Sequence, residues 1–163
     1  MKTIRLFLAA MMMAVVILGY ISSCKSSNTT ALNERTQVIR QQIEDRHYTI
    51  TVNRMLSMNG RSQELTSLYS LTIQGDTLTS YLPYFGQAYS IPYGGGQGLI
   101  FHAPITDYSQ TYDTKGTADI SIRTSSEDDS YIYRIQIFDN GSTTIHVTPN
   151  NRQAISFYGT VEL

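Results

Sequence analysis

The sequence has no tryptophan, a single cysteine and three histidines among its 163 residues. A lone cysteine, Cys24, cannot form a disulfide within the chain. If its thiol is modified, no cysteine nucleophile or thiolate metal ligand remains. The histidines, His47, His102 and His146, have no HExxH or other close metal-ligand spacing. The sequence therefore predicts neither a metal site nor a bound cofactor.

Basic residues are also few, and they are not clustered. Without residues 1–23, which contain Lys2 and Arg5, ten basic residues face thirteen acidic ones, a net charge of −3 with histidine counted as neutral. A protein that binds nucleic acid carries a basic patch or stripe that neutralises phosphates. We therefore expect no nucleic-acid partner.

Motifs of common enzyme classes are missing as well. There is no GxSxG nucleophile elbow, and the glycines at 94–98 lack the Lys-Ser/Thr that completes a phosphate-binding loop. His102 and Asp107, five residues apart across a proline-containing loop, are more typical of solvated loop residues than of a metal pair. Only a catalytic triad assembled by the tertiary structure remains open. We expect a non-enzymatic protein.

The N-terminus has the features of a secretion signal. Lys2 and Arg5 precede an apolar run from Leu6 to Ile21 that is short for a permanent transmembrane helix. The run ends in ISSC at 21–24, which resembles the lipobox of bacterial lipoproteins. This resemblance implies that Cys24 is acylated and becomes the first residue of the mature chain. An unmodified thiol on a signal anchor is the alternative.

This interpretation predicts a signal peptide at 1–23, a tether at 24–32 and a single domain at 33–163. The tether is polar and small-residue-rich (KSSNTT at 25–30). Several acyl chains on one residue anchor a protein stably to a membrane. Because no acidic cluster follows Cys24, we expect an outer-membrane lipoprotein whose domain faces the periplasm.

The hydrophobic pattern predicts one helix followed by strands. Residues 33–46 have a narrow apolar stripe at helical spacing, formed by Leu32, Ile39 and Ile43 with Val38 beside it. From Tyr48 onward the apolar period is two, as in antiparallel strands with one buried face. Turn signals separate these rows at 75–76, 125–130, 140–141 and 149–151. We expect an α+β domain, with the N-terminal helix packed on an antiparallel sheet of about seven strands.

An aromatic and glycine-rich segment, YLPYFGQAYSIPYGGGQG at 81–98, interrupts this pattern. A long connection without regular structure is typically functional or disordered, and aromatic residues argue against disorder. Two interpretations stay open. The aromatic rings fold back to close the core, or they form a recognition surface for a glycan, a peptide or a partner protein. The candidate binding residues are Tyr81, Tyr84, Phe85, Tyr89 and Tyr93.

Three stretches carry a family resemblance: LPYFGQAY at 82–89, GLIF at 98–101 and NRQAISFYG at 151–159. They resemble the domain of unknown function 4251 family, small lipoproteins and secreted proteins of Bacteroidota, over roughly residues 35 to 163. The resemblance implies an α+β fold and a location in the cell envelope. It implies no activity and no catalytic residues.

Together these features predict an envelope-anchored lipoprotein that binds or scaffolds without catalysis. Its expected partners are the membrane, through the lipidated N-terminus, and an envelope protein or glycan, through the aromatic segment. The alternative is an enzyme or inhibitor acting on an envelope polymer such as peptidoglycan or glycan.

Overall fold

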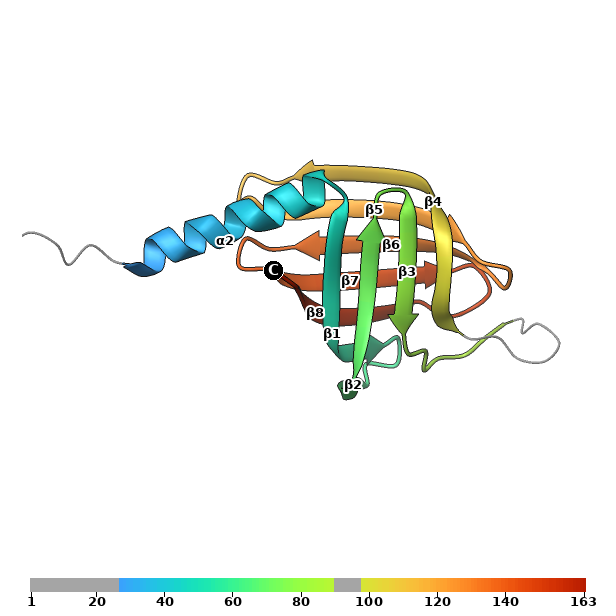
Figure 1. Ribbon diagram of the computed structural model, residues 1–163. Helices are drawn as coiled ribbons and strands as arrows, with labels where there is room; N and C mark the ends of the chain where they lie inside the picture. The colour runs from blue at the N-terminus through green and yellow to red at the C-terminus, as the bar shows by residue number, and fades with distance from the viewer. Residues whose placement is uncertain (1–26, 90–97) are drawn as a thin grey trace, which may run out of the picture. The chain divides into compact units, whose positions relative to one another are not determined.

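The computed structural model describes residues 27–89 and 98–163 of the chain. In this part, one helix, α2 (Ser27–Glu44), precedes eight strands (Figure 1). Each strand pairs antiparallel with the next, and β1 also pairs with β8, so that the sheet closes into a barrel. The strands are β1 (His47–Ser57), β2 (Ser62–Gln74), β3 (Thr77–Leu82), β4 (Leu99–Tyr112), β5 (Ala118–Ser125), β6 (Ser130–Ile137), β7 (Ser142–Pro149) and β8 (Ile155–Val161).

The closed barrel shows that the predicted α+β fold, a helix on an open sheet of about seven strands, is wrong. The period-two pattern does lie in strands, but it is the same for an open sheet and a barrel. Closure depends on the pairing of β1 with β8, which joins the two ends of the domain, for example Ile50 with Val161. No local pattern contains that information.

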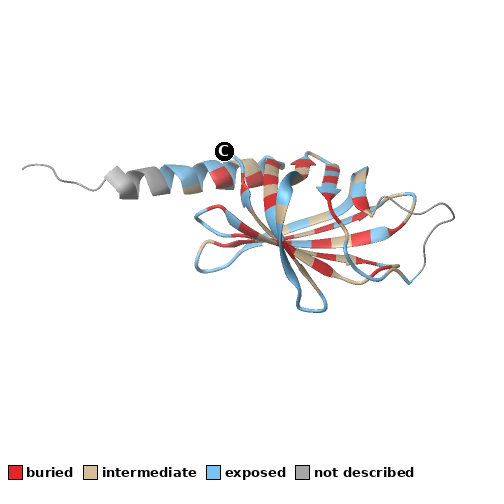
Figure 2. Cartoon of the chain, turned by 90° about the horizontal axis from the view of Figure 1, so that it is seen from below, coloured by how far each residue is buried: buried red, intermediate tan, exposed pale blue. Residues whose placement is uncertain are grey.

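Side chains fill the inside of the barrel. Buried residues alternate with partly or fully exposed ones along β5, β6 and β7, and Figure 2 shows this as bands across the strands. Eight strands enclose a space that apolar side chains can fill. The polar groups inside are paired, since the Tyr133 hydroxyl donates to Ser80 Oγ (3.1 Å) and Ser80 donates to the Leu99 carbonyl (2.6 Å). The barrel interior is therefore a packed core.

The helix lies against the turns at one end of the barrel. Ile39 and Ile43 are buried and belong to the hydrophobic core, whereas Val38 on the outer side is 47% exposed. The Thr36 hydroxyl donates to the Asp139 carbonyl in the β6–β7 turn (3.0 Å). The Arg40 guanidinium lies 5.3 Å from the ring centre of Tyr112 at the end of β4. These contacts close this end of the barrel.

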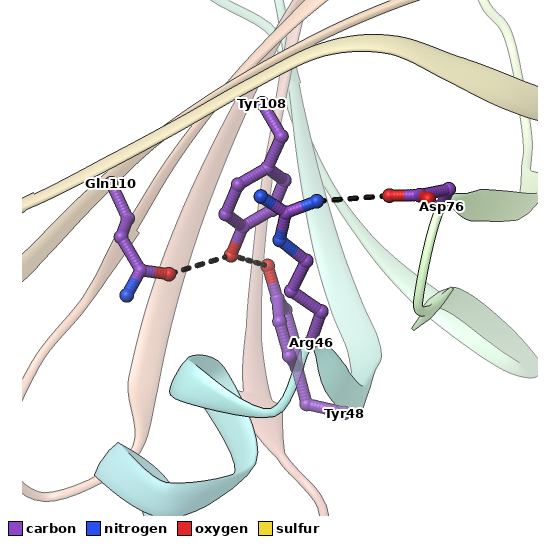
Figure 3. Close-up of polar contacts among 5 residues, drawn as sticks. All are labelled: Arg46, Tyr48, Asp76, Tyr108 and Gln110. Carbon is purple, nitrogen blue, oxygen red and sulfur yellow. Dashed lines mark hydrogen bonds and ion pairs between the residues drawn. The ribbon is translucent and has the colours of Figure 1, made fainter.

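Arg46 joins the end of the helix to the barrel (Figure 3). Its backbone is in the left-handed region (φ 51°), and its Nη1 lies 2.9 Å from Oδ1 of Asp76 in the β2–β3 turn. The guanidinium stacks on Tyr108, 4.3 Å from the ring centre. The hydroxyl groups of Tyr48 and Tyr108 lie 3.4 Å apart, and Tyr108 donates to Gln110 (3.1 Å). Burial raises the pKa of Tyr48 well above its ordinary value, so its hydroxyl stays protonated.

Gly159 allows β8 to approach β1 where the barrel closes. It pairs with Val52, next to a register shift between Val52 and Arg54. A Cβ atom on Gly159 would overlap the Thr51 carbonyl oxygen and would lie 3.1 Å from the Cα atom of Val52. Both neighbours are backbone atoms, so neither can move without disturbing the strand.

We predict that Gly159→Ala lowers the free energy of unfolding by about 2–3 kcal/mol, because the added methyl group forces β8 away from β1. Urea denaturation of the full chain in detergent measures this. Gly60→Asn is the control, since Gly60 has φ 73° and open space around it, and asparagine tolerates that conformation. Equal stability of the two variants would contradict the tight approach at Gly159.

Candidate functional site

The end of the barrel opposite the helix is closed by two connecting segments that pair with each other. Residues 83–89, after β3, run beside residues 151–153, after β7. Ala88 and Arg152 form an isolated antiparallel bridge. The Tyr89 amide donates to the Asn151 carbonyl (2.8 Å), and the Gln153 amide donates to the Gln87 carbonyl (3.0 Å). The first half of the aromatic segment is therefore an ordered part of the fold.

Tyr84 acts as a structural residue within this segment. Its half-buried hydroxyl lies 3.0 Å from the carbonyl oxygens of Gln87 and Gln153, and it donates to either one. Burial raises the pKa of Tyr84, so the hydroxyl remains a donor at neutral pH. A Cβ atom on Gly86 would lie 2.6 Å from this hydroxyl, so a side chain there would displace the Tyr84 ring. Tyr84 helps to cover the end of the core.

The other predicted aromatic residues within the described ranges point outward. Tyr81, Phe85 and Tyr89 are 47%, 53% and 70% exposed. The ring of Tyr81 packs against that of Tyr69, with 5.7 Å between centres. Tyr81 also pairs across the strands with Ile100, which is 38% exposed. Cys24 and Tyr93 lie outside the described residues.

A groove of about 700 Å³ is lined in part by Ile100, the cross-strand neighbour of Tyr81. One wall is the first half of β4, and the other is the turn between β5 and β6. The stacked rings of Phe101 and Tyr131, with 4.6 Å between centres, connect β4 to β6 beside the groove. The lining residues are Gly98, Ile100, Phe101, His102, Ala103 and Pro104 on one side and Ser125, Ser126, Glu127 and Asp128 on the other.

The β4 wall of the groove is an open strand edge. β3 pairs with β4 residues 99–104, but among the described residues β5 pairs with β4 only from Ile105 onward. The Ile105 amide donates toward β3, to the Asp76 carbonyl (2.8 Å). Because successive residues of a strand point their backbone groups to opposite edges, the amide and carbonyl groups of Ile100 and His102 face the groove. The edge ends at Pro104, which has no amide hydrogen and whose carbonyl accepts from the Thr124 hydroxyl (2.8 Å).

The opposite wall of the groove is acidic. Glu127 is exposed and Asp128 is partly exposed, and neither takes part in the ion pairs found among residues 27–89 and 98–163. The neighbouring Asp129 is buried and has a structural role instead. Its carboxylate accepts hydrogen bonds from the backbone amides of Ser130, Asn150 and Asn151. The acidic wall therefore consists of Glu127 and Asp128.

Two smaller surface depressions are less suited to a ligand. One, of about 410 Å³, lies on the outside of β5, β6 and β7. Some of its polar side chains already have partners, since Gln136 donates to Asp119 (2.8 Å) and His146 Nδ1 lies 2.9 Å from the hydroxyl of Ser156, outside the depression. The other, of about 250 Å³, lies beside Tyr48 and Glu162. Neither contains an open strand edge.

The structure gives separate partners to the residues that sequence spacing placed side by side. His102 Nδ1 lies 2.7 Å from the Thr79 hydroxyl, whereas Asp107 pairs with Arg123 (3.7 Å). Within residues 27–89 and 98–163, no three histidine, cysteine or acidic side chains form a group that could hold a metal ion. In the same ranges, no helix is long and apolar enough to cross a membrane. Sequence reasoning missed the open edge, because only strand pairing reveals it.

The fold and groove define a small antiparallel barrel, closed at one end by a helix and at the other by paired loops. The chain belongs to the DUF4251 family, a domain of unknown function, whose model matches residues 31–161. It is similar to the crystal structure of a DUF4251 family protein from Bacteroides eggerthii, with a TM-score of 0.63 and 17% sequence identity over 78% of this chain and 86% of that one. A search of curated proteins found no significant match.

We predict that Tyr84→Ala and Phe85→Ala have different effects on stability. Tyr84 is half-buried and hydrogen-bonded, so its loss lowers the free energy of unfolding by about 2 kcal/mol. Phe85 is 53% exposed, so its loss changes stability by less than about 0.5 kcal/mol. Urea denaturation of both variants checks this. If Phe85→Ala lowered the free energy of unfolding more than Tyr84→Ala, Phe85 would be the residue that covers the core and Tyr84 the surface residue.

Proposed function

We propose that this protein is a non-enzymatic, lipid-anchored binding module of the cell envelope that holds an extended polypeptide segment in the groove beside β4. The observation that carries the proposal is the open edge at Ile100 and His102, which lines a groove of about 700 Å³. An extended peptide adds to such an edge as a further strand and gains main-chain hydrogen bonds. Side chains on alternate positions then contact the groove walls.

The surroundings of the edge support binding over a purely structural role. Exposed strand edges are hazards for aggregation, and many proteins cover or shorten them. Here Pro104 limits the edge to two outward-facing residues, and Tyr81 and Ile100 add apolar surface next to it. Apolar surface beside unpaired amides is suited to a peptide backbone with hydrophobic side chains.

A glycan is the other class of ligand that exposed aromatic rings accept. Sugar rings stack on aromatic faces and do not need strand-like backbone groups. Tyr81, Phe85 and Tyr89 offer such faces, yet the groove itself is lined by backbone of β4 and by an acidic turn. These features favour a polypeptide, and the test below includes glycans as a separate outcome.

The anchor and the location rest on the N-terminal sequence. Lys2, Arg5, the apolar run from Leu6 to Ile21 and the ISSC stretch support lipidation of Cys24. Membership of the DUF4251 family and the similar protein from Bacteroides fit a bacterial envelope protein. We propose attachment to the outer membrane with the barrel facing the periplasm.

The peptide-binding proposal is tested with His102→Pro. Proline removes the amide hydrogen that faces the groove, whereas the backbone bonds from β4 to β3 use the neighbouring residues and stay intact. The lipidated protein, purified in detergent, is used to select from two random heptapeptide libraries on phage. In one library the peptides have free C-termini. In the other they have free N-termini, and their C-termini are fused to the coat protein. We expect selected peptides to bind at least tenfold more weakly to His102→Pro.

His102→Val is the matched control, because it removes the imidazole and its contact with Thr79 but keeps the amide. It should bind selected peptides like the wild type, and thermal melts should show both variants folded. Failure to enrich any peptide, or equal binding by His102→Pro, would overturn the proposal. Binding to a glycan array that survives His102→Pro would assign the aromatic surface to sugars instead.

Lipidation is tested separately with Cys24→Ser. Cells fed an alkyne-tagged palmitate should label the wild-type protein and not the variant, because serine lacks the thiol that accepts the acyl-glyceryl group. Mass spectrometry of the wild-type N-terminus should show a chain that begins at an acylated Cys24. A wild-type chain that keeps residues 1–23 and carries a free thiol would support a signal anchor.

A further inference from the structure

Arg152 carries a buried charge for which the described residues provide no acidic partner. It is 6% exposed, and its Nε atom has no hydrogen-bond partner. None of the ion pairs among residues 27–89 and 98–163 includes it. Its Cζ atom lies 5.6 Å from the centre of the Tyr84 ring, and its charge also acts on the Tyr131 hydroxyl. A buried charge without a partner is strongly destabilising, so it requires an explanation.

Asp129, which like Arg152 acts electrostatically on the Tyr131 hydroxyl, is a candidate partner, but it is already engaged. It is as buried as Arg152, but its carboxylate oxygens accept the backbone amides of Ser130, Asn150 and Asn151 at 2.8 to 3.2 Å. This carboxylate shapes the β7–β8 connection, and it makes no ion pair with Arg152. The guanidinium therefore has no carboxylate partner among the described residues.

The guanidinium lies next to one end of the groove. Its Nη1 atom is 3.5 Å from the position that a Cβ atom of Gly98 would occupy, and Gly98 is the first residue of the β4 wall. The Tyr131 hydroxyl donates to the Gly98 carbonyl from the same side (3.2 Å). Arg152 thus places a positive charge behind Gly98 at one end of the groove, whereas Glu127 and Asp128 make one wall acidic.

The direction of an added strand follows from this charge distribution. A strand that pairs antiparallel with β4 runs from Pro104 toward Gly98. At Gly98 it meets the paired segments 83–89 and 151–153, joined by the bridge between Ala88 and Arg152. A chain cannot continue straight through these segments, so a bound strand turns away or ends there, and the unpaired charge of Arg152 favours an end that carries a carboxylate. The terminus that such a strand brings to Gly98 is its C-terminus, which carries a carboxylate.

We propose that the groove binds the C-terminal tail of a partner polypeptide, with the tail antiparallel to β4 and its α-carboxylate on the guanidinium of Arg152. This inference rests on the proposed peptide-binding function and specifies its ligand. Arginine binds a carboxylate through two parallel hydrogen bonds, and buried backbone and side-chain donors capture chain termini in the same way. The acidic wall favours tails with a basic residue upstream of the terminus.

The first test compares a free carboxylate with a carboxamide on the wild-type lipidated protein in detergent. The most enriched heptapeptide from the free-C-terminus library is synthesised in both forms, and binding is measured by fluorescence anisotropy. We expect the carboxamide to bind about ten- to a hundredfold more weakly, as for the loss of a charge-assisted hydrogen bond. We also expect no binders of comparable affinity from the free-N-terminus library, because its peptides have no free C-terminal carboxylate.

The second test removes the charge with Arg152→Met. Because the charge is buried and unpaired, its removal should leave the Tm unchanged or higher, while the preference for carboxylate over carboxamide is abolished. Arg152→Lys keeps a point charge and should retain part of that preference. Arg54→Met is the control, since Arg54 also stacks on a tyrosine ring but is exposed and does not line the groove. It should keep the preference for carboxylate.

Each outcome separates this inference from the peptide-binding proposal. Equal binding of carboxylate and carboxamide, with both lost in His102→Pro, would keep peptide binding and overturn the role of Arg152. Equal selection from both libraries would do the same. A fall in Tm for Arg152→Met with the carboxylate preference intact would make Arg152 a structural residue. If Arg152→Met does not fold, the carboxamide comparison and Arg152→Lys still decide.

Discussion

The pairing of β1 with β8 is the constraint on which the rest of the structure depends. It removes the two edges that an eight-stranded sheet would otherwise expose, and it encloses the apolar face of every strand. The pairing requires glycine at 159, because backbone atoms of Thr51 and Val52 occupy the space of a side chain. Once the barrel is closed, its two ends are the places where core residues can still meet water, and each end has its own cover.

The two covers differ in what they leave available for binding. At the helix end, Ile39 and Ile43 cover the core, and Arg46 pairs with Asp76 and stacks on Tyr108. At the loop end, β4 is divided between two neighbours, because its first half pairs with β3 and its second half pairs with β5. This division leaves a short unpaired edge at Ile100 and His102. The open edge is therefore a consequence of how β4 is divided between β3 and β5.

The sequence identified most of the strands and turns but not their arrangement. The alternating rows from Ala118 to Val161 match β5 to β8, because each strand has one buried face. β2 and β4 are longer than the pattern indicated, because residues 62–67, polar except for Leu65, do not alternate, and Pro104 interrupts the pattern of β4. The aromatic segment was singled out, yet the distinction between Tyr84 and Phe85 depends on pairing with residues 151–153. Arg152 was not predicted as a functional residue, because the burial of a charge depends on the tertiary structure.

A buried arginine without an acid is a cost to folding that packing alone does not explain. Structural arginines in cores are held by carboxylates, and here Asp129 lies in the same region but is committed to backbone amides. A methionine at 152 would fill similar volume and would keep contact with the Tyr84 ring. A purely structural role would therefore favour an apolar residue at this position. The guanidinium makes physical sense if its counter-charge arrives with a ligand, since the energy lost in the free protein is then recovered on binding.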